Sequence, residues 1–184
     1  MKKIIALLGM PGSGKSEAIG YLQETYGWKK VYFGEVTFDE MKKRGLEVTP
    51  ENERLVREDL RALHGQDYYA RKVVEKLEAL RGEEVVLVES LYSWAEFLVL
   101  KDHFGDDLVT IVIHAAPRVR HARLKNRLER PLTAEQARSR DYAQIVHLRQ
   151  GGPIAMADHV IINEETMGVL EEKLKGVVEE ELGK

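Results

Sequence analysis

The chain has 184 residues, of which 43% are hydrophobic and 32% are charged, and its formal net charge at pH 7 is −3. This composition is typical of one globular domain, and general binders of nucleic acid or membrane surfaces usually carry a basic excess instead. Cysteine is absent, which excludes disulfides and thiolate metal sites and suits a reducing compartment. We therefore expect a cytoplasmic protein without a nucleic-acid or membrane partner, and leave homodimer formation open.

The first predicted element is a strand over residues 4–8, an apolar run too short for the hydrophobic region of a signal peptide. It leads directly into residues 9–16, which match the phosphate-binding pattern G-x-x-x-x-G-K-[ST] without deviation. A helical segment over residues 17–25 follows. Because the motif lies between a strand and a helix, as a phosphate-binding loop must, we read it as one rather than as a chance glycine-rich turn.

The chemistry of this loop follows from what a polyphosphate needs. Several backbone N–H groups must converge on the phosphates, and glycines allow the tightly curved backbone that this requires. The N-terminus of the following helix adds its free amides and its dipole. A lysine side chain then reaches the β and γ phosphates, and a hydroxyl binds Mg²⁺. We predict that ATP, or another nucleoside triphosphate, is bound by Gly9, Met10, Pro11, Gly12, Ser13, Gly14, Lys15, Ser16 and Glu17. In this set Lys15 is the predicted catalytic residue and Ser16 the predicted Mg²⁺ ligand.

Further along the chain, apolar runs alternate with segments of helical length. After residues 4–8 these runs occupy residues 31–33, 85–88, 108–113 and 160–162. Their continuous apolarity is typical of strands covered on both faces, so they predict an α/β fold with a mostly parallel sheet. Residues 35–82 read as a helical flap inserted into that core, with one helix predicted to begin at Thr49-Pro50. A single domain over residues 1–184 is expected.

The third apolar run ends in a carboxylate, Glu89. Enzymes with this phosphate-binding loop place an acid at such a strand end to hold Mg²⁺ or its water shell. Since glutamate replaces the more usual aspartate, a role as general base toward a substrate hydroxyl is also open. A surface position is the alternative, and Glu35 or Asp39 could supply the carboxylate instead. We predict that Glu89 is catalytic and binds the metal.

An arginine series lies between residues 118 and 140. Arg120, Arg123 and Arg127 are spaced so that one helix would carry them on one face. Residues 127–152 are rich in arginine and contain a capping-box pattern at Thr133, which predicts a mobile lid that neutralises the transferring phosphoryl group. A solvated, salt-bridged helix face is the alternative. We predict that Arg123 and Arg127 are catalytic and bind the nucleotide.

Taken together, the motifs resemble an archaeal family described as adenylate-kinase-related. The resemblance is carried by residues 9–16, 34–36, 43–46, 49–52, 114–117, 123–124, 140–141 and 157–163, together with Arg127. It covers nearly the whole chain. The Ala157-Asp158 to Asn163 run before a closing helix is also similar to dephospho-CoA kinase. The resemblance implies the fold of nucleoside monophosphate kinases, a five-stranded parallel sheet with an acceptor-binding flap and a lid, and it places Asn163 among the nucleotide-binding residues.

Two positions depart from the pattern of nucleotide kinases. Phe38 stands four residues after Gly34, where those enzymes usually carry an arginine that grips the acceptor phosphate. The second departure is Tyr92, which ends the run Glu89-Ser90-Leu91-Tyr92 where the family tends to have Asp-Gly-Ile-Arg. We therefore expect ATP- and Mg²⁺-dependent phosphoryl transfer to a small molecule, most simply a nucleotide or nucleoside-like acceptor. A kinase for a bare hydroxyl, such as a nucleoside or dephospho-CoA, and a regulatory nucleotide-binding switch are the alternatives.

Overall fold

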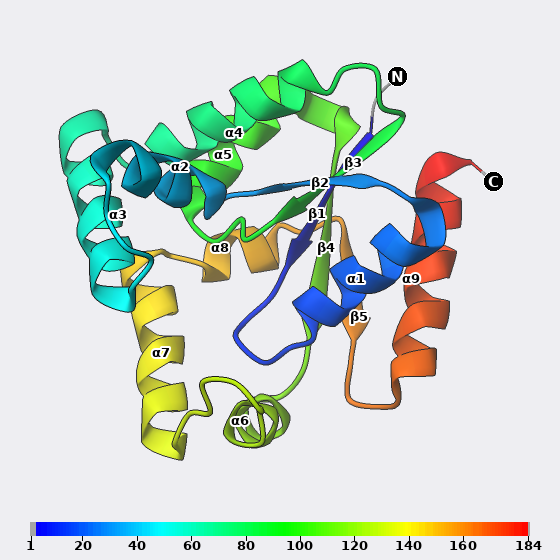
Figure 1. The fold of residues 1–184 in the computed structure, drawn as a ribbon. Coiled ribbons are helices and arrows are strands. Elements are labelled where there is room, and N and C mark those ends of the chain that lie inside the picture. The colour runs from blue at the N-terminus through cyan, green and yellow to red at the C-terminus, as the bar shows by residue number, and fades with distance from the viewer. Residues whose placement is uncertain (1–2, 184) are drawn as a thin grey trace.

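The computed structural model describes residues 3–183, and its centre is a sheet of five parallel strands (Figure 1). The strands are β1 (Lys3–Leu8), β2 (Lys29–Tyr32), β3 (Val85–Glu89), β4 (Leu108–His114) and β5 (His159–Ile162). They are ordered β2-β3-β1-β4-β5. In this register Leu7 pairs with Glu89 on one side and with Ile111 on the other. The sequence predicted all five strands, and their parallel arrangement is confirmed.

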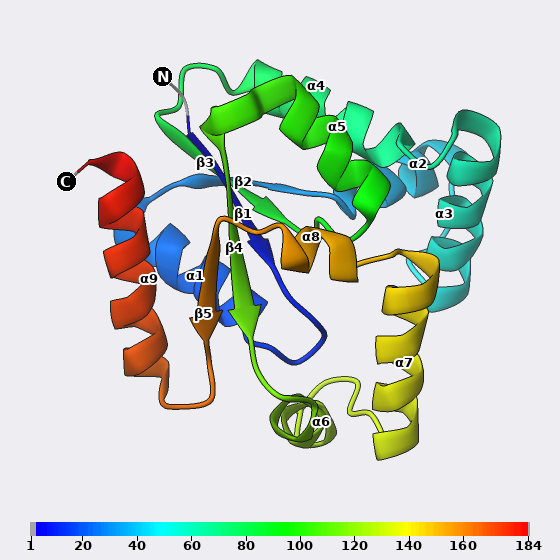
Figure 2. The ribbon, with the colours of Figure 1, turned by 180° about the vertical axis from the view of Figure 1, so that it is seen from behind.

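Helices cover both faces of the sheet, which explains why its strands are continuously apolar. On one face lie α4 (Tyr68–Ala79) and α5 (Trp94–Phe104), with α2 (Glu35–Arg44) and α3 (Pro50–His64) packed against α4, and on the other face lie α1 (Lys15–Tyr26) and α9 (Met167–Leu182). Figure 2 shows the two layers on opposite sides of the strands. Side chains of β1 alternate between the two cores: Ile4, Ala6 and Leu8 pack with the first layer, Ile5 and Leu7 with the second.

Two of the remaining helices, α6 (Pro117–Lys125) and α7 (Ala134–His147), lie toward the edge where the strands end. The short α8 (Gly151–Ala155) packs against α5, and the 3-10 helix η1 (Gly105–Asp107) precedes β4. In Figure 1 the turn after β1, α6 and α7 all lie on this side of the sheet, away from both chain termini. Ligands of open α/β sheets bind outside the carboxyl ends of the strands, so this edge is where a site is expected. No helix within residues 3–183 is long and apolar enough to cross a membrane.

The predicted flap and lid are both helical in the structure. The flap contains α2, α3 and α4, and α4 also packs on β2 and α5, so the flap is partly a layer of the core. Thr49 caps α3 and Thr133 forms a capping box at α7, as their sequence patterns predicted. The prediction that one helix carries Arg120, Arg123 and Arg127 is wrong, because α6 ends at Lys125.

Candidate active site

The loop between β1 and α1 has the backbone that its glycines permit. Gly9 and Gly14 have φ values of 138° and 102°, in the region that favours glycine. A Cβ added to Gly9 would lie 2.3 Å from the Ile113 carbonyl oxygen, and one added to Gly14 would lie 2.2 Å from Nδ2 of Asn163. The loop therefore needs glycine at these positions both for its conformation and for its close packing against β4 and Asn163.

Lys15 begins α1, and its side chain turns back over the loop. Nζ donates hydrogen bonds to the carbonyl oxygens of Gly9, at 2.6 Å, and Met10, at 3.1 Å. Burial, followed by the positive charges of Arg140, Arg120 and Arg127 in that order, lowers the pKa of Lys15 from 10.5 to about 8. The ammonium group thus lies among other positive charges, and a bound polyanion would reduce the repulsion between them.

Three polar side chains hold this loop from outside. Arg120, which is buried, donates to the Pro11 carbonyl oxygen at 3.0 Å. Gln150 Nε2 donates to the Gly9 carbonyl oxygen at 3.1 Å, and Asn163 Nδ2 donates to that of Ser13 at 2.8 Å. Asn163 was predicted to bind nucleotide; its amide supports the loop, while the residue also lines a cavity beside it. Arg120 and Gln150 were not predicted as loop supports, since nothing local in the sequence marks these contacts.

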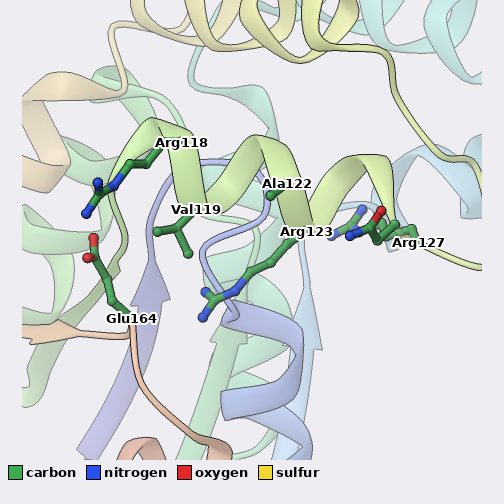
Figure 3. Close-up of a pocket in the computed structure, with 7 residues that line it drawn as sticks. Arg118, Val119, Ala122, Arg123, Arg127 and Glu164 are labelled. Atoms are coloured by element: carbon green, nitrogen blue, oxygen red, sulfur yellow. The ribbon is translucent and has the colours of Figure 1, made fainter.

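A cavity of about 310 Å³ adjoins the loop on the side of α6 and α9. It is lined by Gly12, Gly14, Glu17, Arg123, Arg127, Asn163, Glu165 and Met167. A hollow of about 800 Å³ along α6 shares Arg123 and Arg127 with it. Figure 3 shows Arg123 reaching from α6 toward the start of α1, while Arg118 extends toward Glu164. The buried Nη1 of Arg123 has no hydrogen-bond partner among the described residues, so this arginine can still bind an anion.

A second cavity, of about 200 Å³, lies over the loop itself. Its walls are Pro11, Gly12, Gly14, Lys15, Ser16, Glu17, Tyr32, Glu89, Ser90, Tyr92, Arg127, Arg140 and Gln144. The structure thus brings together Lys15, Ser16, Glu89 and Arg127 from distant segments. Glu89 also has an unpredicted partner, Lys30, whose Nζ is 2.6 Å from Oε2. The alternative carboxylates, Glu35 and Asp39, instead pair with Lys76 at 2.9 Å each.

The oxygen atoms of this cavity suit Mg²⁺. Ser16 and Glu89 supply a hydroxyl and a carboxylate, which are ligands that this hard cation prefers. Among residues 3–183 no group of three or more histidine or acidic side chains is placed to hold a metal. Mg²⁺ characteristically takes one or two protein carboxylates and completes its shell with waters and substrate phosphates. The residues present therefore fit an ion that arrives with a nucleotide.

A third cavity, of about 410 Å³, lies between the flap and the lid. It is lined by Tyr32, Phe33, Gly34, Thr37, Phe38, Glu53, Arg57, Arg61, Tyr69, Ser90, Tyr92, Glu96, Arg130, Arg140, Gln144 and Leu148. Both Phe38 and Tyr92, which replace expected arginines, lie in its wall. The cavity shares Tyr32, Ser90, Tyr92, Arg140 and Gln144 with the 200 Å³ cavity, so the two are adjacent.

Comparison with known proteins places the chain among archaeal relatives. It is 36% identical to UPF0200 protein TK1334 of Thermococcus kodakarensis, over 98% of this chain and 99% of the relative. It is 35% identical to UPF0200 protein MJ1399 of Methanocaldococcus jannaschii, over 96% of this chain and 89% of the relative. The chain belongs to the UPF0200 family. A family model described as "AAA domain" also matches residues 5–147 of this UPF0200 protein.

Solved structures share the fold of the UPF0200 chain. TT1252 from Thermus thermophilus superimposes with a TM-score of 0.68 at 23% identity, covering 97% of each chain. Shikimate kinase from Acinetobacter baumannii, in complex with shikimate, gives a TM-score of 0.60 at 15% identity, covering 100% of this chain and 94% of the enzyme. The predicted P-loop kinase fold is therefore confirmed. A specific relationship to adenylate kinases or dephospho-CoA kinase stays a prediction.

The arginine series of this UPF0200 protein is divided among different environments. Arg123 lines the 310 Å³ cavity, Arg127 lines both that cavity and the 200 Å³ cavity, and Arg120 is buried behind the loop. Arg140 lines the 200 Å³ cavity and was absent from the predicted site, as was Gln144. The arginine-rich composition of the lid was the available signal for Arg140. No local feature of the sequence marks Gln144 as a site residue.

Proposed function

We propose that the chain is a Mg²⁺-dependent kinase that transfers the terminal phosphoryl group of ATP, or of another nucleoside triphosphate, to a small molecule. In this proposal the triphosphate occupies the 200 Å³ cavity over the loop, with its nucleoside toward the 310 Å³ cavity. The acceptor occupies the 410 Å³ cavity. This volume is in the range of small-molecule sites, about 300 to 1,000 Å³.

The observation that carries the proposal is the shared wall between the loop cavity and the flap–lid cavity. Tyr92, Arg140 and Gln144 belong to both. A nucleotide-binding switch has no need of a second cavity that opens at the position of the terminal phosphate. A kinase does need one, because its two substrates must meet in line within a water-excluding site.

The side chains of the loop cavity have distinct roles in this transfer. Lys15, now bonded to the carbonyl oxygens of Gly9 and Met10, binds the phosphates and stabilises the charge that develops on them. Arg127 and Arg140 have no carboxylate within 4.0 Å among residues 3–183, and they neutralise the equatorial oxygens. Glu89 either orients the water shell of Mg²⁺ or accepts the proton of an acceptor hydroxyl, and both roles need its negative charge. Bound Mg²⁺ neutralises phosphate charge.

The test is transfer of a labelled γ-phosphoryl group from ATP to a panel of nucleosides, nucleotides and small hydroxy acids. Lys15→Ala should lower turnover about 10²- to 10³-fold, because it removes a charge aimed at the transferring group. Glu89→Gln should lower turnover strongly with little loss of stability, since the amide keeps the shape but not the charge. Lys175→Ala, an exposed position on α9, is the control and should leave turnover unchanged.

Two results would overturn the proposal. One is near-wild-type turnover by a folded Lys15→Ala variant, which would remove the loop from the chemistry. The other is Mg-ATP binding accompanied only by release of inorganic phosphate, with no phosphorylated product from any acceptor. That pattern would identify a nucleotide-hydrolysing switch.

A further inference from the structure

The 410 Å³ cavity between flap and lid has an excess of positive charge. Four arginines and two glutamates line it: Arg57, Arg61, Arg130, Arg140, Glu53 and Glu96. The glutamates are each close to one arginine. Glu53 lies 3.4 Å from Arg57, and the buried Glu96 lies 3.3 Å from Arg61. Neither Arg130 nor Arg140 has a carboxylate within 4.0 Å in the described part of the chain.

The two α3 arginines that line this cavity are held to different degrees. Arg61 is fixed by Glu96 and by Tyr69, whose ring centre lies 4.8 Å from the guanidinium carbon. Glu96 is itself fixed, since it accepts a 3.0 Å hydrogen bond from the Ser93 backbone N–H. Arg57 has only the 3.4 Å contact to Glu53, and its side chain is 40% exposed. Of these two arginines, Arg57 is therefore the one that can more readily turn to a ligand.

Like charges that converge on a cavity repel one another, and an anion in the cavity removes that repulsion. Guanidinium groups bind carboxylates and phosphates through paired N–H donors, a geometry that lysine lacks. The arginines also come from positions other than those that nucleotide kinases use, where this chain has Phe38 and Tyr92. The two aromatic side chains, with Tyr32 and Tyr69, instead offer flat apolar surface to the ligand.

An unpartnered oxygen marks the boundary with the loop cavity. Gln144 is buried and lines both cavities, and its Oε1 has no hydrogen-bond partner in the described structure. A buried acceptor atom without a donor is costly unless a ligand supplies one. A hydroxyl group on the ligand would satisfy it at the end of the cavity nearest Lys15.

We propose that the acceptor is a small, ring-bearing organic anion whose carboxylate or phosphate group binds Arg57 and Arg130 and which presents a hydroxyl to Gln144. This inference rests on the proposed kinase function and gives the class of its second substrate. The anionic group lies in the part of the cavity formed by α3 and the segment after α6. Arg140, which lines both cavities, is left for the transferring phosphoryl group.

The experiment measures thermal stabilisation of the full chain by two matched pairs of probes. Donor sites are first filled with Mg²⁺ and a non-hydrolysable ATP analogue, so that the probes report on the second cavity. One pair is AMP and adenosine; the other is a hydroxycyclohexanecarboxylate and its uncharged amide. Arg57→Gln and Arg130→Gln are compared with the wild type. The control is Arg54→Gln, on the same helix as Arg57 but with a 70% exposed side chain.

In the wild type the anionic member of at least one pair should stabilise the chain more than its neutral counterpart. The pair that does so identifies phosphate or carboxylate as the bound group. Arg57→Gln and Arg130→Gln should each weaken that anion about tenfold or more, the usual effect of losing a charge-assisted hydrogen bond. Arg54→Gln should bind it as the wild type does.

The inference is overturned if neutral and anionic probes stabilise the chain equally, or if Arg57→Gln and Arg130→Gln bind the anion like the wild type. It is also overturned if the ATP analogue binds and neither anion stabilises the chain further. Failure of the ATP analogue itself to stabilise the wild type would instead overturn the proposed kinase function on which the inference rests.

Discussion

At the residue scale, the electrostatics of Lys15 link the phosphate-binding loop to its proposed ligand. Burial and the charges of Arg140, Arg120 and Arg127 lower the pKa of its ammonium group from 10.5 to about 8, whereas Glu17 opposes them. Between pH 8 and 10.5 the unfolded chain therefore holds more of this proton than the folded chain. Lys15 consequently opposes folding below pH 8, and stability rises with pH across that interval as the penalty is relieved.

A bound triphosphate should reverse this shift, because its negative charge favours protonated Lys15. We predict that Mg-ATP binding at pH 8 takes up as much as about half a proton, since half of these groups are uncharged when pH equals pKa. At pH 6, where Lys15 is already protonated, this uptake should vanish. Calorimetry in two buffers of different ionisation enthalpy measures this proton uptake. The Lys15→Arg variant, whose side chain stays charged at both pH 6 and pH 8, should take up no proton at this position. Equal proton uptake at pH 6 and pH 8 would contradict the assignment.

At the element scale, a buried ion pair joins α6 to α7 and to the phosphate-binding loop. Arg120 donates two 2.8 Å hydrogen bonds to the carboxylate of Asp141, and Arg120 Nη1 also contacts Pro11. His121 lies 2.9 Å from the same carboxylate. Burial raises the pKa of Asp141, but the hydrogen bonds from Arg120 and His121 outweigh it and hold this pKa below its ordinary value. The pair therefore stabilises the fold above pH 3.8, and that contribution is lost as the pH falls through the lower folded pKa.

We predict that Asp141→Asn lowers the free energy of unfolding by about 3 to 5 kcal/mol, because it leaves the charge of Arg120 buried without its partner. The matched control is Glu58→Gln, which removes the exposed pair between Arg54 and Glu58 and should cost less than about 1 kcal/mol. Urea unfolding of both variants measures the difference. Similar midpoints for the two variants would show that the buried pair does not hold α7 in place.

The same ion pair shows how far sequence reasoning reaches. Residues 9–16 could be assigned from the sequence because their chemistry depends on neighbours along the chain. The five strands could be predicted because burial on both faces of the sheet requires continuous runs of apolar residues. The sequence alone could not predict that Arg120 and Arg140 lie in different environments. One is buried by Asp141 and the other lines a cavity, and both outcomes depend on how α7 packs against α6. Spacing along the chain carries no information about that packing.

At the scale of the whole molecule, the three cavities form a series along the edge where the strands end. Arg127 lies between the 310 and 200 Å³ cavities, and Arg140 lies between the 200 and 410 Å³ cavities. Both arginines belong to the segment over residues 127–152, whereas the opposite walls come mainly from the loop after β1, the start of α1, the end of β3 and the flap. Ligands in these cavities would therefore contact the lid and the core together, which couples binding to the position of the lid.

The lid should consequently be the part of the molecule whose stability responds most to nucleotide. Within it Ile145 and Val146 are 49% and 63% exposed, so α7 is held to the core by the polar contacts of Asp141 more than by apolar packing. Such a segment opens locally at a low free-energy cost. We predict that Mg²⁺ with a non-hydrolysable ATP analogue slows amide hydrogen exchange over residues 127–152, since each charge-assisted bond to the lid contributes about 1.5 to 3 kcal/mol before ordering costs.

The comparison that isolates Arg127 uses a second arginine of the lid. Arg127→Met should abolish most of the nucleotide-induced protection, because it removes a charge that lines both nucleotide cavities. Arg138→Met, at an exposed position of α7 lining a different hollow, should retain that protection. Exchange over residues 174–182 of α9, beyond the cavity-lining Met167 at the start of that helix, serves as the internal reference and should change little in either variant. If residues 127–152 are fully protected without nucleotide, or if both variants lose protection equally, Arg127 has a structural role and the lid does not close on the nucleotide.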